Sequence, residues 1–187
     1  YRVEIRQWYE DLTREAVPAP RSAGEFSYPE ENGNFASVLP AAVPMNAGGG
    51  LPDEFNLDVP FTAQAPLKEW DATHEEACEE ASVVMVDYFY KDKTFASPEL
   101  ADEEILKFID YEKKFLGFFE STTADELARA VESYYDYDVD LVYDFSVDNV
   151  KQAVRRGYPV IVPAAGQVLD NPHFKDPGPV YHMLVVK

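Results

Sequence analysis

The sequence is poor in the groups that build disulfides, metal centres and nucleic-acid interfaces. Its 187 residues include one cysteine, three histidines, and 16 lysines and arginines against 35 aspartates and glutamates. A single cysteine cannot form an intrachain disulfide. The net charge of −19 repels phosphate, which argues against nucleic acid or anionic lipid as a partner. No apolar run approaches the roughly 18 residues that a membrane span needs, so we expect no membrane contact by the domain itself.

Apolar residues are plentiful, at 46% of the chain, which is enough for a buried core. Residues 1–16 predict a short amphipathic helix or the end of a stalk. Residues 17–50 are rich in proline, alanine and glycine and end in a glycine triplet, which indicates a linker. Cleavage after paired glycines is the alternative interpretation of that triplet. We expect the compact domain at 51–187, and the start at Tyr1 indicates a fragment or the mature part of a longer protein.

Hydrophobic periodicity in the domain predicts helices first and strands later. A capping box at Thr73 and Glu76 predicts a helix that begins at about residue 74. Further helices are expected over 98–115, from 122 or 123 to about 134, and over 146–156. Strands are expected at 57–62 on a sheet edge, at 139–143, at 158–164 in a central position, and at 180–186. This order predicts an α+β fold with N-terminal helices packed on a mostly antiparallel sheet.

Three residues could supply the parts of a thiol hydrolase. Cys78 lies near the start of a predicted helix, where the helix dipole favours a thiolate. His182, in the last predicted strand, could take the thiol proton and later protonate a leaving amine. Gln64 could stabilise an oxyanion together with the backbone N–H of Cys78. A cysteine on a helix is also commonly a small buried hydrophobe, and a histidine in a strand is commonly a packing or surface residue.

Acidic residues around the cysteine oppose its ionisation. Glu75, Glu76, Glu79 and Glu80 all lie within three residues of Cys78. Solvent would screen those that point outward, whereas Glu79 or Glu80 turned inward would order the helix or a substrate.

The remaining candidate ligands predict no metal site and no cofactor. His74 is expected one helical turn before Cys78, and His173 in the loop before the last strand, but the spacing fits no compact zinc pattern. The aspartates between 136 and 148 lack the glycine and the spacing of a calcium-binding loop.

Several segments in the same order resemble the peptidase family C thirty-nine-like proteins, which are papain-like cysteine peptidase domains related to double-glycine bacteriocin-processing peptidases. These segments are VPFTAQAP, Trp70, ACEEAS, YPVIVPAAG and GPVYHMLVV, and the resemblance covers about residues 57–187. It implies a papain-like fold, Cys78 as nucleophile, His182 as general base and Gln64 as oxyanion donor. On that basis we expect Trp70 and Glu79 to contact substrate. Proteins of this kind are often exported or tethered to the bacterial cell surface, which predicts an extracellular or surface location and a peptide or protein substrate.

One element of the family pattern is missing. A third residue, usually an aspartate, should orient the histidine, and the sequence stops five residues after His182. Asn171 is a weak substitute, so we expect the third residue beyond Lys187. A cysteine peptidase is therefore one hypothesis. The alternatives are a catalytically inactive papain-like surface module that binds a partner protein, and a subunit of a surface assembly.

Overall fold

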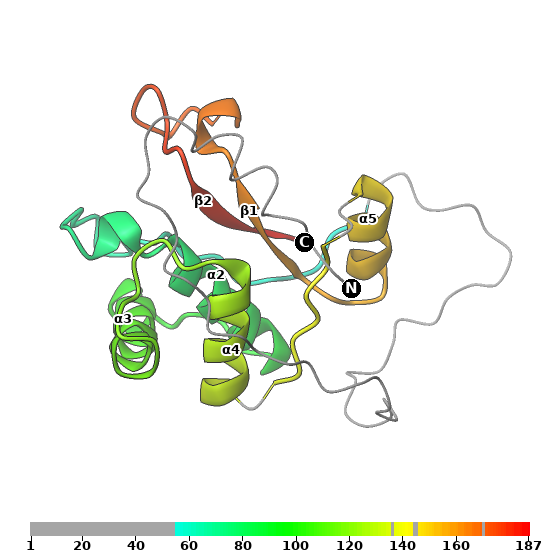
Figure 1. Cartoon of the computed structure of the whole chain (residues 1–187), viewed down its shortest axis with the longest axis horizontal. Coiled ribbons are helices and arrows are strands. Elements are labelled where there is room, and N and C mark those ends of the chain that lie inside the picture. The colour runs from blue at the N-terminus through cyan, green and yellow to red at the C-terminus, as the bar shows by residue number, and fades with distance from the viewer. Residues whose placement is uncertain (1–54, 136, 144–145, 170) are drawn as a thin grey trace, which may run out of the picture.

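The computed structural model describes residues 55–135, 137–143, 146–169 and 171–187. The predicted helix at 1–16 and the linker at 17–50 lie outside these residues. The described elements, in order, are η1 (His74–Glu76), α2 (Cys78–Tyr90), α3 (Pro98–Phe115), α4 (Ala124–Tyr135), α5 (Val147–Arg155), β1 (Val160–Ala164), η2 (Gly166–Val168) and β2 (His182–Val186). Four α-helices and two strands make up this mixed α+β arrangement (Figure 1).

The later helices begin where their capping residues predict. The hydroxyl of Ser97 accepts a hydrogen bond from the N–H of Leu100, with proline next in the chain, and α3 follows. Thr123 and Glu126 form a reciprocal capping box in front of α4. Ser146 caps α5 in the same way as Ser97 caps α3. The predicted positions of these three helices are confirmed.

The start of α2 differs from the prediction. Asp71, and not Thr73, accepts the hydrogen bonds from the N–H groups of Thr73 and His74, at 3.0 and 2.8 Å. The side chain of Thr73 makes no capping bond, and residues 74–76 form the short 3-10 helix η1. The α-helix itself begins at Cys78, so the cysteine lies in its first turn.

The described strands form one antiparallel pair, with Val160 opposite Val186 and Ala164 opposite His182. The predicted edge strand at 57–62 is wrong, because these residues have no strand structure. Their alternating pattern has another cause: Leu57 and Val59 are buried against a cluster that includes Val154 of α5. Burial at every second residue requires an extended chain but no ladder of hydrogen bonds.

Of the other three predicted strands, one is absent from the described residues and two are confirmed. Residues 139–143 have no strand beyond a single bridge at Tyr143, so that prediction is wrong. Strand β1 lies within 158–164 and β2 within 180–186, as predicted. The residues of β1 are only half buried, however, and β1 pairs with β2 alone among the described residues. The central position predicted for this strand is therefore wrong.

Helix α2 is the centre of the described structure and is buried on almost every side. One face packs against Ile105 and Ile109 of α3, and another meets Leu127 of α4 and Met183 of β2. Figure 1 shows α2 behind α4, with the strand pair crossing above both. The sequence pattern predicts one buried face for this helix, whereas the structure buries Glu79 and Glu80 as well.

Candidate functional site

Cys78 lies where the first turn of α2 meets strand β2. Its side chain is buried, with 8% of the residue exposed. The backbone N–H of Met183 donates a hydrogen bond to Cys78 Sγ at 3.3 Å, across 105 residues of sequence. Met183 itself is 2% exposed and packs in the same apolar cluster as the cysteine. The strand backbone is thereby held against the sulfur.

The second contact of the thiol is with the next residue. Cys78 Sγ donates a hydrogen bond to Glu79 Oε2 at 2.9 Å. Burial, with the neighbouring Glu79 charge added, raises the pKa of the Cys78 thiol well above its usual range. Burial, with the charge of Glu80 added, raises the pKa of Glu79 to about 8. At neutral pH the sulfur is therefore a protonated thiol next to a mostly protonated carboxyl group.

His182 is the first residue of β2 and immediately precedes Met183. Its ring packs edge-on against Phe174, with 5.2 Å between the ring centroids. Within the described residues, neither ring nitrogen of His182 has a hydrogen-bond partner. Burial lowers the pKa of His182, so the imidazole is neutral at pH 7 and able to accept a proton. The fold brings the backbone of His182 to the thiol, but its ring is not hydrogen-bonded to Sγ.

Gln64 is attached to the segment that leads into α2. Its Nε2 donates to the carbonyl oxygens of His74 at 2.8 Å and Glu75 at 3.2 Å. These bonds occupy both hydrogens of the amide, so an oxyanion role requires one of them to be exchanged. Trp70 lies in the loop before η1 and is 54% exposed. Its exposed ring is compatible with substrate contact and with a plain surface position.

His74 has a role that the sequence did not predict. Its Nδ1 and Nε2 each lie 2.8 Å from a carboxylate, of Asp71 and of Asp102 on α3. Burial opposes its positive charge, but the two carboxylates outweigh burial and raise its pKa. His74 therefore joins η1 to α3. The predicted placement of His74 on the same helix as Cys78 is wrong, because His74 lies in η1. The only sign of this role in the sequence was Asp71, three residues before His74.

Three glutamates are fully buried where α2 and α3 meet, two of them next to the thiol in sequence. Glu79 and Glu80 of α2 and Glu112 of α3 are each at most 1% exposed. The carboxyl groups of Glu80 and Glu112 face each other, and their oxygens find no donor among the described residues unless one carries a proton. Burial raises the pKa of Glu112 to about 7 and that of Glu80 well above its usual range. This is the buried acidic cluster.

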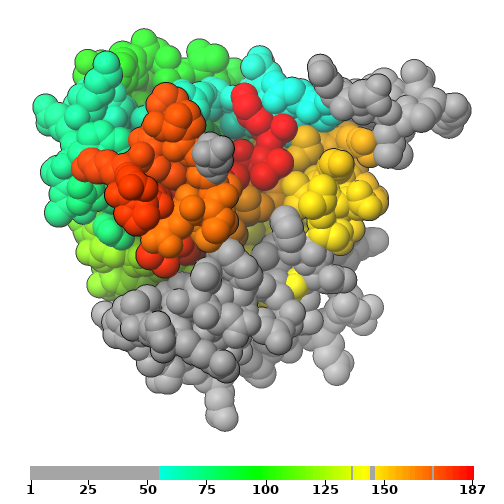
Figure 2. All heavy atoms as spheres, turned by 90° about the horizontal axis from the view of Figure 1, so that it is seen from above, coloured from blue at the N-terminus to red at the C-terminus, as the bar shows by residue number. Residues whose placement is uncertain are grey.

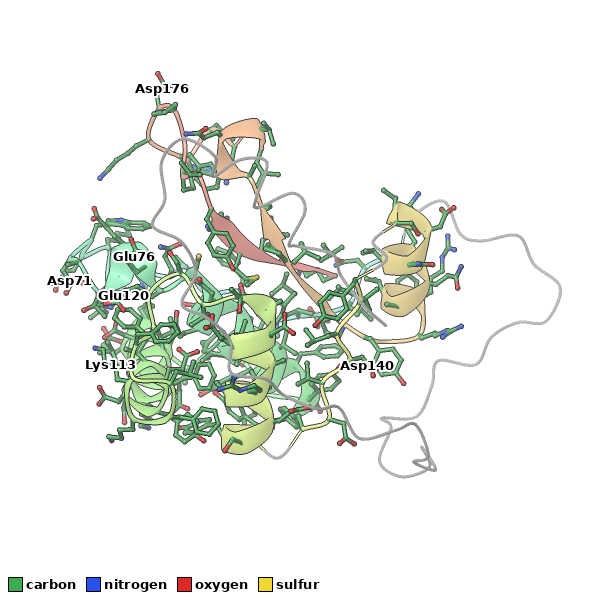
Figure 3. The ribbon with its side chains drawn as sticks, in the orientation of Figure 1. Asp71, Glu76, Lys113, Glu120, Asp140 and Asp176 are labelled. Carbon is green, nitrogen blue, oxygen red and sulfur yellow. The ribbon has the colours of Figure 1, made fainter. Side chains whose placement is uncertain are left out.

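Two further acidic residues lie near this cluster. Glu76 and Glu120 lie near one another at its outer side, beside η1 and α3 (Figure 3). The hydroxyl of Ser121, next to Glu120, donates to Glu76 at 3.4 Å. Of the four glutamates near Cys78, Glu75 points into solvent, with 55% of its side chain exposed, and Glu76 is half buried.

The connection between β1 and β2 extends to the loop around η1. Lys175 Nζ lies 3.9 Å from Glu75 Oε1, and Figure 2 shows the orange and red residues of this connection beside the teal residues before α2. Asp176 lies at its outer end in Figure 3. Asn171, the weak candidate for orienting His182, instead accepts a hydrogen bond from the N–H of His173 at 3.0 Å.

Two general properties of the described residues complete the picture. They contain no group of three or more histidine, cysteine, aspartate or glutamate side chains placed to hold a metal ion. None of their helices combines the length and apolar character needed to cross a membrane.

A cysteine at a helix start, held against a strand that begins with histidine, is the arrangement that the ACEEAS and YHM segments predict. The model of the Peptidase C39 like family matches residues 56–187. The chain belongs to this family. No curated protein and no solved structure matches the chain. The family match covers all of the described residues except Phe55, and it includes Cys78, His182 and Gln64.

Proposed function

We propose that the domain is a thiol-dependent peptidase, which hydrolyses peptide bonds of an extracellular peptide or protein through Cys78 and His182. The observation that carries this proposal is the contact of Cys78 Sγ with the backbone of Met183, next to His182, in a chain of a peptidase-like family. This contact supports the pairing of Cys78 with His182, because it holds the backbone beside His182 at a helix N-terminus, where an anionic sulfur is stabilised.

The reaction begins from a neutral pair. A ring nitrogen of His182 comes within reach of Sγ and takes the thiol proton, and the thiolate attacks the scissile carbonyl carbon. A C–S bond forms, and the carbonyl electrons move to oxygen. In this proposal the backbone N–H of Cys78, in the first turn of α2, stabilises this oxyanion. The C–N bond then breaks as His182 protonates the amine, and water hydrolyses the thioester to release the acid and the thiol.

Gln64 and Trp70 have supporting roles in this proposal. Gln64 supplies a second oxyanion donor if one of its bonds to the carbonyl groups of His74 and Glu75 is exchanged on substrate binding. Trp70 offers an exposed aromatic surface to the substrate.

The experiment compares four proteins on a mixture of internally quenched peptides with randomised sequences. Wild type should cleave some of them, Cys78→Ser should be inactive, and His182→Ala should lose about 100-fold or more, since a positioned acid and base contributes roughly 10²–10⁴-fold. His173→Ala is the matched control, because His173 is exposed in the connection before β2. Equal turnover by wild type and His182→Ala would refute the role of the histidine.

A second function is favoured by the burial of the thiol, which raises the pKa of Cys78. In that case the domain is an inactive surface module that binds a partner protein, or a subunit of a surface assembly. Its signature would be no turnover by wild type and equal partner binding by wild type and Cys78→Ser. The tether in residues 17–50 and the surface location belong to both proposals. Protection of residues 1–50 from added protease only on intact cells would support assembly.

A further inference from the structure

Glu79 is an unusual neighbour for a nucleophilic sulfur. Its Oε2 accepts the thiol hydrogen bond at 2.9 Å, whereas its Oε1 is buried with no partner among the described residues. A buried carboxyl oxygen without a partner is unfavourable, so the side chain would turn to solvent if packing allowed it. The first turn of α2 and the Met183 N–H both favour a negative sulfur. Glu79 acts in the opposite direction.

We propose that Glu79 is a positioning residue: it accepts the hydrogen bond of the Cys78 thiol at rest, and its charge limits the ionisation of that thiol at alkaline pH. The inference deepens the proposed function, on which it rests for the role of Cys78 as nucleophile. It does not require that the peptide substrate be known.

The charged groups that act on this pair directly are Glu76 of η1 and Glu80 of α2. Glu112 of α3 and Glu120 after α3 act on Glu80, and Glu112 also interacts with Glu79. All of these groups are acidic, and the nearby His182 of β2 is neutral at pH 7 because burial lowers its pKa. Glu79 is the carboxyl group hydrogen-bonded to the sulfur, so its charge has the largest effect on the thiolate.

The order in which the protons leave determines the reactivity. Glu79 loses its proton at about pH 8, before the thiol does. Its negative charge then lies 2.9 Å from Sγ and opposes the loss of a second proton. In the peptidase reaction, the thiol proton moves to His182 while Glu79 stays protonated, so only one negative charge forms in the site. Turnover should therefore fall above about pH 8 in wild type.

Glu79→Gln removes this charge with little change in shape, and two measurements report the effect. Because the chain has one cysteine, protein with ¹³C-labelled cysteine gives a single Cβ resonance that follows thiolate formation. In Glu79→Gln, the pH midpoint of this Cβ resonance should move down by at least about one pH unit. The rate of alkylation by iodoacetamide should rise at least about tenfold at pH 8.5 and be nearly unchanged at pH 5.5, where Glu79 is neutral in wild type.

The controls separate this role from a structural one. Asp110→Asn removes an exposed carboxylate on α3 and should leave both measurements unchanged. Glu79→Asp restores a carboxyl group and should return part of the wild-type pH dependence. A purely structural role would change the alkylation rate by the same factor at every pH. If Glu79→Gln does not fold, wild type still tests the inference: its Cβ resonance should show a small step near pH 8, and its absence would overturn the proposal.

The two proposals fail in different ways. If the peptidase proposal is wrong, wild type will show no turnover, and Glu79→Gln will still lower the pH midpoint of Cys78. If Glu79 does not limit the ionisation of Cys78, wild type and Glu79→Gln will have equal pH midpoints for Cys78, whatever the turnover.

Discussion

Stability should fall as pH rises from about 5 to 8, and Glu112→Gln should reduce this loss. Glu112 is fully buried against Glu80, and burial raises its pKa to about 7, from an ordinary value of 4.5. Between pH 4.5 and about pH 7, the native state therefore binds more protons than the unfolded state. The contribution of Glu112 is therefore fully present below about pH 4.5 and is lost as pH rises through about 7.

The size of this effect follows from the shift. A change of one pKa unit corresponds to roughly 1.4 kcal/mol, so Glu112 alone should lower the free energy of unfolding by roughly 3 kcal/mol above pH 7. Glu79, with a pKa of about 8, acts in the same direction at slightly higher pH. A glutamine at 112 cannot ionise, and its amide can donate to Glu80. The variant should therefore keep roughly 3 kcal/mol more of its pH 5 stability at pH 8 than wild type does.

Urea unfolding followed by far-ultraviolet circular dichroism, at pH 5, 6, 7 and 8, measures the difference. Asp110→Asn is the matched control, because it removes one exposed carboxylate two residues away on the same helix. It corrects for the lower net charge, which itself reduces repulsion at high pH. Parallel curves for Glu112→Gln and Asp110→Asn would refute the reasoning, since the buried carboxyl would then ionise without cost.

Two further predictions concern the support of the site. Asp102→Asn should lower the free energy of unfolding by about 1–3 kcal/mol, because it weakens the hydrogen bond to His74. Since the pKa of His74 is raised in the fold, this loss should be larger at pH 5.5 than at pH 8.5, as urea unfolding at both values will show. Phe108→Ala should cost about 3–5 kcal/mol by leaving a cavity between α3 and α4. Leu106→Ala, at a 36% exposed position on the same helix, is its control; equal losses would contradict the cavity argument.

The local signals in the sequence predicted the later elements well. Ser97, Thr123 and Ser146 each supply an oxygen at a helix start, and this interaction involves residues only three positions apart. The same locality explains the error at Thr73. Two oxygen-bearing side chains, of Asp71 and Thr73, were available. Asp71 binds both the N–H and the ring of His74, and the other ring nitrogen of His74 is held by Asp102 on α3. That partner is 28 residues away.

The predicted strands at 57–62 and 139–143 show a second limit. Alternation of apolar and polar residues reports which side chains are buried, and Leu57 and Val59 are indeed buried. It does not report whether another strand lies alongside. Here the apolar surface that covers these two residues includes α5. The alternating pattern carries no information on hydrogen bonds to a neighbouring strand.

The sequence by itself determined the chemical groups, namely one thiol at a helix start, one histidine in the last strand and an acidic ACEEAS segment. Only the tertiary structure decided their charge states. It placed β2 against Cys78, turned Glu79 and Glu80 inward and set Glu112 opposite them. Because the energy of a charge depends on the water it loses and on the groups that replace that water, residue order cannot show which of these groups keep their protons.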